Sequence, residues 1–258
     1  LDTKNPRINN FRKHFLTLIS ENSGRSEVFR NAAEVFKNWD GMHNIKAAGP
    51  TIFHRLFYHL SLGIFADEIE EKGTLVLLNV SLIDKSMPLL LNNPQSPWWD
   101  NVDTPDIRES QAEILRSAWV NAVQSLEEDY GSNVNSWEWG RIHTLEIKHL
   151  LGRQKPLNLF FNIGPFPVPG SKGVVNQLRH KYGPKELKVS SGPSTRRVID
   201  FGNPENSVGI NPTGQAGYFF DQHYRNQTPL YLAGEYRKQR MNQKDILANK
   251  TSRLIFRP

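Results

Sequence analysis

The sequence predicts an α+β fold, in which a helical N-terminal layer precedes an antiparallel, β-rich part. Three observations support this class. Apolar residues repeat at helical spacing near the start, a longer amphipathic stretch with end signals follows, and short alternating segments separated by Gly and Pro make up the remainder. We therefore divide the chain into a mainly helical part, residues 1–136, and a β-rich part, residues 137–258.

The first three helices are predicted from the spacing of apolar side chains. In each of them the pattern i, i+3, i+4 places the apolar groups on one helical face. These positions are Phe11, Phe15, Leu16 and Ile19; Phe29, Ala32, Ala33 and Phe36; and Ile52, Phe53, Leu56, Phe57 and Leu60. Residues 74–80 fit a short strand or a buried helical turn, and periodicity does not decide between them.

The clearest helix is predicted from Pro105 to about Tyr130. Thr104 suits the N-cap, Pro105 suits the first helical position, and Gly131 is a natural stop. Beyond Trp139 the period changes to that of strands. Strands are predicted over residues 141–149, 196–201, 207–210 and 253–256, with an irregular or helical return over 224–236.

Composition excludes several classes of protein. The 258 residues contain no cysteine, which excludes a disulfide scaffold, a thiol nucleophile, a Cys-ligated zinc and an iron–sulfur cluster. No stretch approaches the roughly 20 consecutive apolar residues of a membrane span, so we expect no membrane partner. The chain opens at Leu1 and not at Met, and we expect a processed product or part of a longer one.

The net charge of +6 is concentrated at the C-terminal end. Residues 225–258 hold eight basic and two acidic side chains, so the rest of the chain is neutral in sum. A solvated face, or a face against an acidic partner chain, explains such a charge run. A nucleic-acid surface is the alternative, but no aromatic stacking platform is interleaved with the basic residues, and we expect no nucleic-acid partner.

No group of residues forms a metal site by spacing. His54 and His59 are five residues apart and so do not face each other on a helix, and a structural or surface role is expected for both. His143 and His149 share a face of the predicted strand, but about 20 Å separates them, so both are expected to be hydrogen-bonded and partly buried. The acidic groups at 67–71 and 127–129 are interpreted as solvated faces. A calcium loop would need a Gly among Asp100, Asn101, Asp103 and Asp106, and none is present.

Serine nucleophiles and phosphate loops are equally unsupported. Neither GxSxG nor SxxK occurs, and Ser190, Ser191 and Ser194 are expected in turns. Gly170-Ser171-Lys172-Gly173 lacks the spacing of a phosphate-binding loop. From the residues alone, the chain carries no self-contained active site.

A family resemblance appears when the motifs are taken in order. The C-terminal third contains Gly192-Pro193-Ser194-Thr195-Arg196 leading to Asp200, then Gly214-Gln215-Ala216-Gly217, His223-Tyr224 before Gln227, and Gly234-Glu235-Tyr236-Arg237. Upstream lie Leu1-Asp2-Thr3, Trp39-Asp40-Gly41, Trp139-Gly140-Arg141-Ile142-His143 and Val174-Val175-Asn176. Together these resemble the penicillin amidase (penicillin acylase) family of N-terminal-nucleophile hydrolases, over nearly the whole chain. Ala216, Tyr218-Phe219-Phe220 and Asn226 depart from the family's usual residues, which we interpret as loop variation.

The resemblance implies a fold and an activity. It implies a portion of the αββα sandwich of these hydrolases, from the C-terminal part of the large chain. In this family a precursor cuts itself to free a serine, whose own α-amino group accepts the hydroxyl proton as the serine attacks an amide. An α-amino group has a pKa near 8 and is partly deprotonated at neutral pH. The products are a carboxylic acid and an amine.

The family's serine and oxyanion asparagine lie before the region that this chain resembles, so no catalytic residue is assigned here and the segment alone is expected to be inactive. Arg196, Asp200 and Gln215 match family motif positions. We expect structural roles for them, namely strand pairing, a buried ion pair and a loop hydrogen bond, or alternatively support of the nucleophile's strand.

The resemblance also implies partners and a location. The partners are the small chain, the N-terminal part of the large chain and a small-molecule acyl amide. No cofactor is expected in this segment, although the parent protein resembles members that bind calcium. A periplasmic or extracellular zymogen is expected, and the acyl group stays open among aryl-acetyl, phenoxy-acetyl, glutaryl and long fatty acyl groups. The alternative is a non-enzymatic binding or scaffold module derived from this fold.

Overall fold

The computed structural model describes residues 2–6, 8–21, 26–80, 82–250 and 252–256. Its contacts divide the chain into two compact units. Unit 1 comprises residues 1–146 and 165–192, and unit 2 comprises residues 147–164 and 193–258. These units follow contact density, whereas the division at residues 136 and 137 follows secondary-structure content and stays a prediction.

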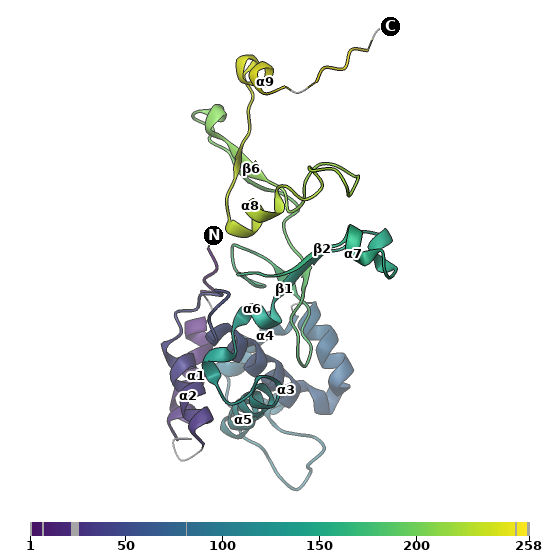
Figure 1. The fold of residues 1–258 in the computed structure, drawn as a ribbon. Helices are drawn as coiled ribbons and strands as arrows, with labels where there is room; N and C mark the ends of the chain where they lie inside the picture. The colour runs from purple at the N-terminus through teal and green to yellow at the C-terminus, as the bar shows by residue number, and fades with distance from the viewer. Residues whose placement is uncertain (1, 7, 22–25, 81, 251, 257–258) are drawn as a thin grey trace. The chain divides into compact units, whose positions relative to one another are not determined.

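Helices dominate unit 1 (Figure 1). They are α1 (Ile8–Glu21), α2 (Glu27–Asn38), α3 (Gly49–Asn79), α4 (Leu82–Leu91), α5 (Gln111–Tyr130) and α6 (Trp139–Ile142), with short 3₁₀ turns η1 (Pro97–Trp99) and η2 (Val134–Ser136). Helices α1, α2 and α3 confirm the three helices expected from apolar spacing. The undecided residues 74–80 belong to the end of α3 and its C-cap, so the helical alternative is correct there.

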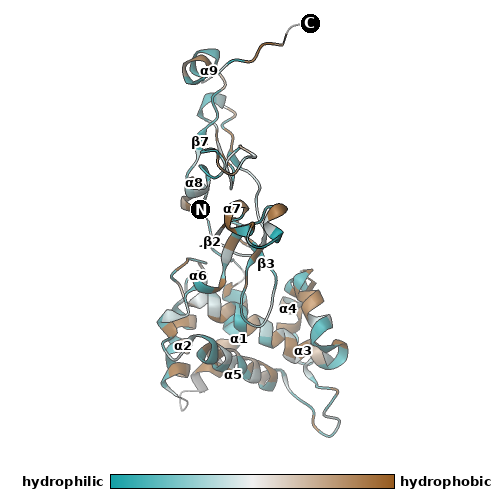
Figure 2. Cartoon of the chain, turned by 45° about the vertical axis from the view of Figure 1, so that its right-hand side comes forward, coloured by the Kyte–Doolittle hydropathy of each residue, from teal (hydrophilic) through white to brown (hydrophobic). Residues whose placement is uncertain are grey.

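The core of unit 1 lies where α3 packs along α5 and against α2, and where Phe11 of α1 contacts Phe53 of α3. Phe15, Phe36, Leu56 and Leu60 have no exposed surface, and Trp119 has almost none. Figure 2 shows hydrophobic and hydrophilic colours alternating along these helices, as expected for amphipathic elements that bury one face. Burial of these side chains supplies the main driving force for folding of the unit.

Helix α3 bends at Glu70, whose φ of 59° lies in the left-handed region. Beyond the bend, the Thr74 hydroxyl donates to the Glu70 carbonyl over 3.1 Å. Among the described residues, no individual helix has the length and apolar character to cross a membrane. Within the same described residues, α3 and α4 taken together pass that test by length and composition, and they meet at an angle of 106°.

Helix α5 begins later than the sequence predicts. Its N-cap is Ser110, and the Ser110 and Glu113 side chains form a reciprocal capping box with each other's backbone N–H. The expected N-cap, Thr104, instead donates its hydroxyl to the Asn101 carbonyl and to Glu109. The predicted start at Pro105 was wrong because two cap signals, Thr104 and Ser110, lie in succession. The helix uses the second, because Ser110 with Glu113 forms a capping box that satisfies two backbone donors.

The predicted strand over residues 141–149 is also wrong in part. Residues 139–142 form α6, and the strand β1 covers only Thr144–Ile147. The Trp139 amide donates to the Ala47 carbonyl and the Gly140 amide to the Ile45 carbonyl. These hydrogen bonds fix the first residues of α6, which therefore do not form a strand. His143 is therefore the C-cap of α6, and it does not share a strand face with His149.

Short strand pairs complete the fold, and the pair β3–β4 is antiparallel. Strand β1 pairs with β2 (Ile163–Pro167), and β3 (Arg179–His180) pairs with β4 (Val189–Ser191). Ser190 and Ser191 thus lie in a strand and not in the expected turn.

Unit 2 contains η3 (Leu151–Arg153), α7 (Asn158–Phe161), η4 (Pro204–Asn206), α8 (Thr228–Ala233) and α9 (Gln243–Asn249). Its antiparallel sheet has the order β5-β6-β7, formed by Arg196–Val198, Val208–Ile210 and Arg237–Lys238. Strands β5 and β6 confirm the predictions at 196–201 and 207–210, although both are shorter. Helix α8 confirms the helical alternative for residues 224–236.

The predicted strand at 253–256 is wrong. Leu254, Ile255 and Phe256 are 79%, 57% and 86% exposed and belong to no strand. An alternating pattern makes a strand only where a partner supplies the ladder hydrogen bonds, and the described residues supply none here.

Candidate functional site

Four histidines from distant parts of the sequence meet inside unit 1. His43 follows α2, His54 lies on α3, His143 caps α6 and His180 lies on β3. Each is at most 4% exposed. The ring centroids of His54 and His180 are 4.7 Å apart, and those of His43 and His54 are 5.2 Å apart. We call these four residues the histidine cluster.

Trp139 holds the cluster together. Its indole stacks on His54 and on His143, with ring centroids 4.9 Å and 4.5 Å away and interplanar angles of 21°. The indole N–H donates to the Gly170 carbonyl over 2.9 Å. Because Trp139 is fully buried, its ring fixes the planes of both imidazoles.

One assignment of protons satisfies the hydrogen bonds of His43 and His54. His43 Nδ1 lies 3.2 Å from the Thr3 carbonyl oxygen, which can only accept, so this nitrogen donates. In a neutral ring the opposite nitrogen then accepts, and His54 Nε2 donates to His43 Nε2 over 3.1 Å. His54 Nδ1 in turn accepts from the Tyr182 hydroxyl at 2.9 Å. The Ser171 hydroxyl, 3.1 Å from His54 Nε2, can accept from the same proton.

Burial keeps the cluster uncharged at neutral pH. Desolvation lowers the pKa of both His43 and His143 to about 4. The pKa of His54 and that of His180 are well below the usual value, again chiefly because both rings are removed from water. Burial raises the pKa of Tyr182 well above its usual value. These pKa directions agree with the neutral rings taken for the hydrogen-bond assignment.

A partly buried ion pair borders the cluster. Lys172 Nζ lies 2.7 Å from Asp84 Oδ2, and it also donates to the Leu78 carbonyl over 2.8 Å. The Lys172 side chain is only 8% exposed, and its ammonium group lies 5.6 Å from the centroid of the Tyr182 ring. The carboxylate offsets the charge of the lysine where little water can do so.

A cavity of about 400 Å³ adjoins this ion pair. Its apolar wall consists of Phe11 from α1, Phe53 and Phe57 from α3, and Met87 and Leu91 from α4. Its polar end holds His54, Asp84, Lys172 and Tyr182, which contact one another, and Asn5 and Asn10 are also among the lining residues. We call it the α1–α4 cavity. An apolar hollow with a few convergent polar groups is the usual form of a small-molecule site.

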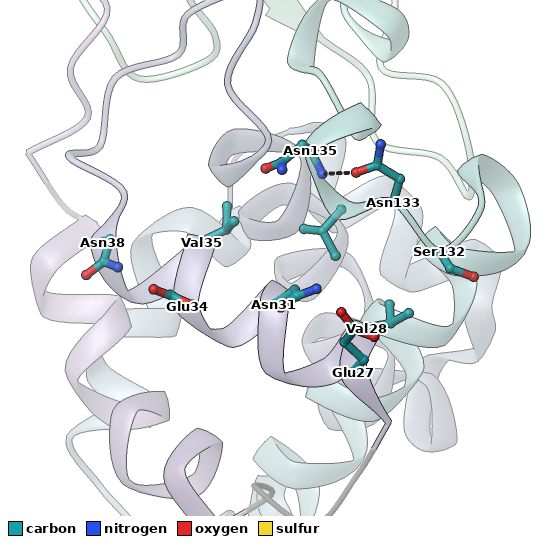
Figure 3. Close-up of a pocket in the computed structure, with 10 residues that line it drawn as sticks. Glu27, Val28, Asn31, Glu34, Val35, Asn38, Ser132, Asn133 and Asn135 are labelled. Carbon is teal, nitrogen blue, oxygen red and sulfur yellow. Dashed lines mark hydrogen bonds between the residues drawn. The ribbon is translucent and has the colours of Figure 1, made fainter.

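A second hollow of about 710 Å³ lies between α2 and the turn η2. Figure 3 shows Glu27, Asn31 and Glu34 along one side of it and Asn133 with Asn135 on the other, joined by the hydrogen bond from the Asn135 amide to Asn133 Oδ1. No aromatic or basic side chain is among the residues that line it. Its apolar lining residues are the valines Val28, Val35 and Val134, so it lacks the aromatic wall of the α1–α4 cavity.

The residues singled out from the sequence lie in unit 2. Arg196, at the start of β5, donates to the Tyr231 carbonyl over 2.7 Å and its guanidinium carbon lies 3.7 Å from the centroid of the Tyr231 ring. Burial lowers the pKa of Arg196. The contacts join β5 to α8.

Asp200 makes local hydrogen bonds, and Gln215 lies exposed in a loop. The Asp200 carboxylate accepts from the amides of Gly202 and Asn203 over 2.9 Å and 3.0 Å. Hydrogen bonds from Asn203, Asn206 and Gly202 lower its pKa. Asp200 is exposed, so the expected buried ion pair does not involve it. Gln215 is exposed, in a loop closed by the Gly214 amide on the Tyr224 carbonyl. A role in supporting a catalytic strand stays a prediction for all three residues.

The carboxylates do not assemble a metal centre. Within the part of the chain that the structure describes, no three His, Asp or Glu side chains are placed to hold a metal ion. In the loop considered for calcium, Asp100 Oδ1 accepts from the Glu109 amide and Asn101 Oδ1 accepts from the Asp103 amide. Those oxygens satisfy the backbone of the loop itself.

One acidic group expected at a solvated face is buried. Asp129 pairs with Arg55 over 2.9 Å and with Lys185 over 3.0 Å, and its side chain is 12% exposed. Burial alone would raise the pKa of Asp129, but the hydrogen bonds and charges of Lys185 and Arg55 outweigh it and lower the pKa. Asp129 is shielded because α3 packs on α5, and the spacing of residues within α5 does not reveal that contact.

The histidine cluster itself was missed. Its bonds connect residues 11 and 128 positions apart, so no pattern within one helix or strand contains it. His54 was considered only with His59, which bonds Ser125 instead at 3.1 Å. Ser171 and Lys172 were considered only as a phosphate loop. The signals present in the sequence were the motif Trp139-Gly140-Arg141-Ile142-His143, which ends at a cluster histidine, and Trp39-Asp40-Gly41, which lies two residues before His43.

Comparison with known proteins places these features in context. A family model described as penicillin amidase matches residues 1–248. The acyl-homoserine lactone acylase QuiP of Pseudomonas aeruginosa is 25% identical over 224 residues, which is 80% of this chain and 26% of that protein. The QuiP acylase of Pseudomonas fluorescens strain Pf0-1 is 29% identical over 147 residues, 57% of this chain and 17% of that protein. The chain thus spans about a quarter or less of the length of these curated relatives.

A solved structure shares the fold. The thermostable penicillin G acylase from Alcaligenes faecalis superposes with a TM-score of 0.51 at 17% identity, over all of this chain and 48% of that one. At this identity the likeness concerns the fold alone. It confirms the α+β class.

Proposed function

Because the chain belongs to the penicillin amidase family, we propose that it forms the C-terminal part of an acylase that hydrolyses an acyl amide to a carboxylic acid and an amine. The observation that carries the proposal is the family match over residues 1–248, which includes all of the motifs noted in order along the sequence. A match of this extent involves the whole framework of the chain and not one short motif.

The nucleophile is proposed to come from a part of the protein outside residues 1–258. A serine with a free α-amino group attacks the amide carbonyl, and that amine accepts the hydroxyl proton and later delivers it to the leaving amine. Amide N–H groups stabilise the oxyanion of the intermediate. Ser171 does not fulfil these requirements, since it is fully buried and its α-nitrogen is part of a peptide bond.

The role proposed for this chain is to build and support the framework that holds that serine. The buried side chains of the histidine cluster and Trp139 join α3, α6 and β3 into one body. In unit 2, Arg196 joins β5 to α8. Rigid support of this kind matters because small misplacements of a nucleophile slow acyl transfer.

The substrate class is proposed to be N-acyl amides with an apolar acyl group. The relatives are named as acyl-homoserine lactone acylases and the structural neighbour as a penicillin G acylase, and both names describe the removal of an acyl group. An acyl-homoserine lactone is therefore the first substrate to test. Autoproteolytic processing of a zymogen, a calcium ion in the parent protein and a periplasmic or extracellular location are proposals from the same family membership.

The test is hydrolysis of a panel of amides by the complete gene product beside residues 1–258 alone. The panel holds phenylacetyl, glutaryl and decanoyl 4-nitroanilides together with decanoyl-homoserine lactone, and mass spectrometry detects the released acid. We expect acid release by the complete product and none by the shorter chain. Hydrolysis by residues 1–258 alone would contradict the assignment of the nucleophile. No hydrolysis by either would favour a binding or scaffold module.

A further inference from the structure

The α1–α4 cavity has the form of a small-molecule site within unit 1. Its volume of about 400 Å³ lies within the ~300–1,000 Å³ range of small-molecule sites. Met87 and Leu91 in its wall are 1% and 3% exposed, and Phe53 is 7% exposed. The walls are therefore side chains packed into the fold and not a loose surface groove.

The lining charges cancel. Lys172 and Asp84 form one ion pair at 2.7 Å, and the other titratable groups at the polar end, His54 and Tyr182, are neutral at pH 7. An ionised head group would leave one charge of this pair without its partner, or bring a charge into an apolar hollow without a counter-charge, and both are costly. The cavity thus favours an uncharged head group.

The polar end offers both acceptors and a donor. Lys172 has three N–H donors, and Asp84 and the Leu78 carbonyl occupy two of them. Asp84 pairs with Lys172 through Oδ2 and is itself among the lining residues, and a carboxylate can accept more than one hydrogen bond. The Tyr182 hydroxyl gives its proton to His54, so its oxygen can accept. A head group with one carbonyl and one N–H matches this set.

We propose that the α1–α4 cavity binds an uncharged amphipathic molecule, an alkyl chain that ends in a carboxamide. The alkyl chain packs on Phe57, Met87 and Leu91, while the amide carbonyl accepts from Lys172 and the amide N–H donates to Asp84 or Tyr182. The histidine cluster fixes the direction of the Tyr182 proton through His54. The proposal does not rest on acylase activity, because it concerns binding within unit 1 of this chain.

The test uses three probes that share an eight-carbon chain and differ in the charge of the head group: octanamide, octanoate and octylammonium. Isothermal titration of the complete gene product at pH 7.5 measures their affinities. We expect saturable binding of octanamide, about tenfold or more tighter than either ionised probe, a difference that corresponds to about 1.4 kcal/mol. Equal or tighter binding of octanoate or octylammonium overturns the proposal, and so does the absence of saturable octanamide binding.

Variants locate the site. Met87→Phe fills the cavity and is expected to weaken octanamide binding about tenfold or more, whereas Leu89→Phe on the same helix, at a side chain 74% exposed, leaves it unchanged. Leu91→Phe is a second filling variant if Met87→Phe does not fold by circular dichroism. Tyr182→Phe is expected to weaken binding about fivefold, the size of one hydrogen bond. If octanamide binding is unchanged in both filling variants, the molecule binds at another site, such as the proposed catalytic site. That result overturns the assignment.

Discussion

The Nδ1 atom of His54 lies 2.9 Å from the hydroxyl oxygen of Tyr182, 128 residues later in the sequence. This bond links the longest helix of unit 1 to the segment that follows β3. It also sets the proton positions of the chain of hydrogen bonds that runs through His43 to the backbone at Thr3. The N-terminal residues, α3 and the later part of unit 1 are thereby joined by one buried polar network.

The histidine cluster predicts acid instability. Because burial lowers the pKa of these rings from 6.5, to about 4 for His43 and His143, the unfolded chain binds more protons than the folded one below pH 6.5. The stabilising contribution of the neutral rings is complete above about pH 6.5 and is lost as pH falls toward 4. Denaturant midpoints at pH 7.5, 6.0 and 5.0 are expected to decline in that order.

A matched pair of variants identifies the source of that decline. His180→Gln removes one buried titrating ring and is expected to reduce the loss of stability between pH 7.5 and 5.0, whereas His223→Gln, at an exposed histidine, leaves the loss unchanged. A wild-type midpoint that does not move over this range would contradict the neutral cluster.

The Arg55–Asp129–Lys185 group predicts a large effect of removing its carboxylate. Asp129→Ala leaves Arg55, whose side chain is 6% exposed, without that partner, and we expect a loss of about 3–5 kcal/mol of unfolding free energy. The comparison is Glu138→Ala, which removes the partner of the 82% exposed Lys46 and should cost less than about 1 kcal/mol. Similar effects of the two substitutions, measured by urea denaturation, would show that Asp129 is solvated after all.

Alanine substitution at two glycines of α3 is expected to change the stability of the protein in opposite directions. A Cβ at Gly49 would overlap Cγ of the Trp39 ring, so Gly49→Ala should destabilise the protein by about 1–3 kcal/mol. At the exposed Gly63 the nearest atom, from Ile114, is 3.4 Å away. Gly63→Ala should therefore stabilise the helix by up to about 1 kcal/mol. Thermal melting checks both, and a stabilising Gly49→Ala would refute the tight packing of Trp39.

The capping box of α5 predicts a loss that a conservative variant avoids. Ser110→Ala removes the side-chain acceptor for the Glu113 amide and should cost about 1 kcal/mol. Ser110→Asn retains an acceptor and should cost only a fraction of that. If the two variants melt at the same temperature, the helix does not depend on this cap.

The helical part of the fold was largely predictable because each helix buries one face, and its apolar spacing is local to the helix. The start of α5 was misplaced since Thr104-Pro105 and Ser110 with Glu113 are both adequate start signals, and only the second is used. Residues 253–256 show the converse case, in which the alternation is present but no described strand pairs with it.

The site was much less predictable than the fold. The family motifs led to Arg196, Asp200 and Gln215 in unit 2. Arg196 and Asp200 make hydrogen bonds there, and Gln215 lies exposed in a loop. The cluster around His54 and the cavity beside Lys172 arise where four separate segments meet, and helical spacing carries no information about such meetings. Spacing arguments excluded a metal site for His54 and His59 without indicating the true neighbours of either residue.

The most direct test of the central claim is to locate the nucleophile of the complete gene product. The protein is treated with a serine-directed sulfonyl fluoride, and peptide mapping by mass spectrometry identifies the labelled residue while the loss of amide hydrolysis is followed in parallel. The account predicts that inactivation accompanies one label, on an N-terminal serine outside residues 1–258. A label on Ser171 or on any other serine of this chain that parallels the loss of activity would contradict it.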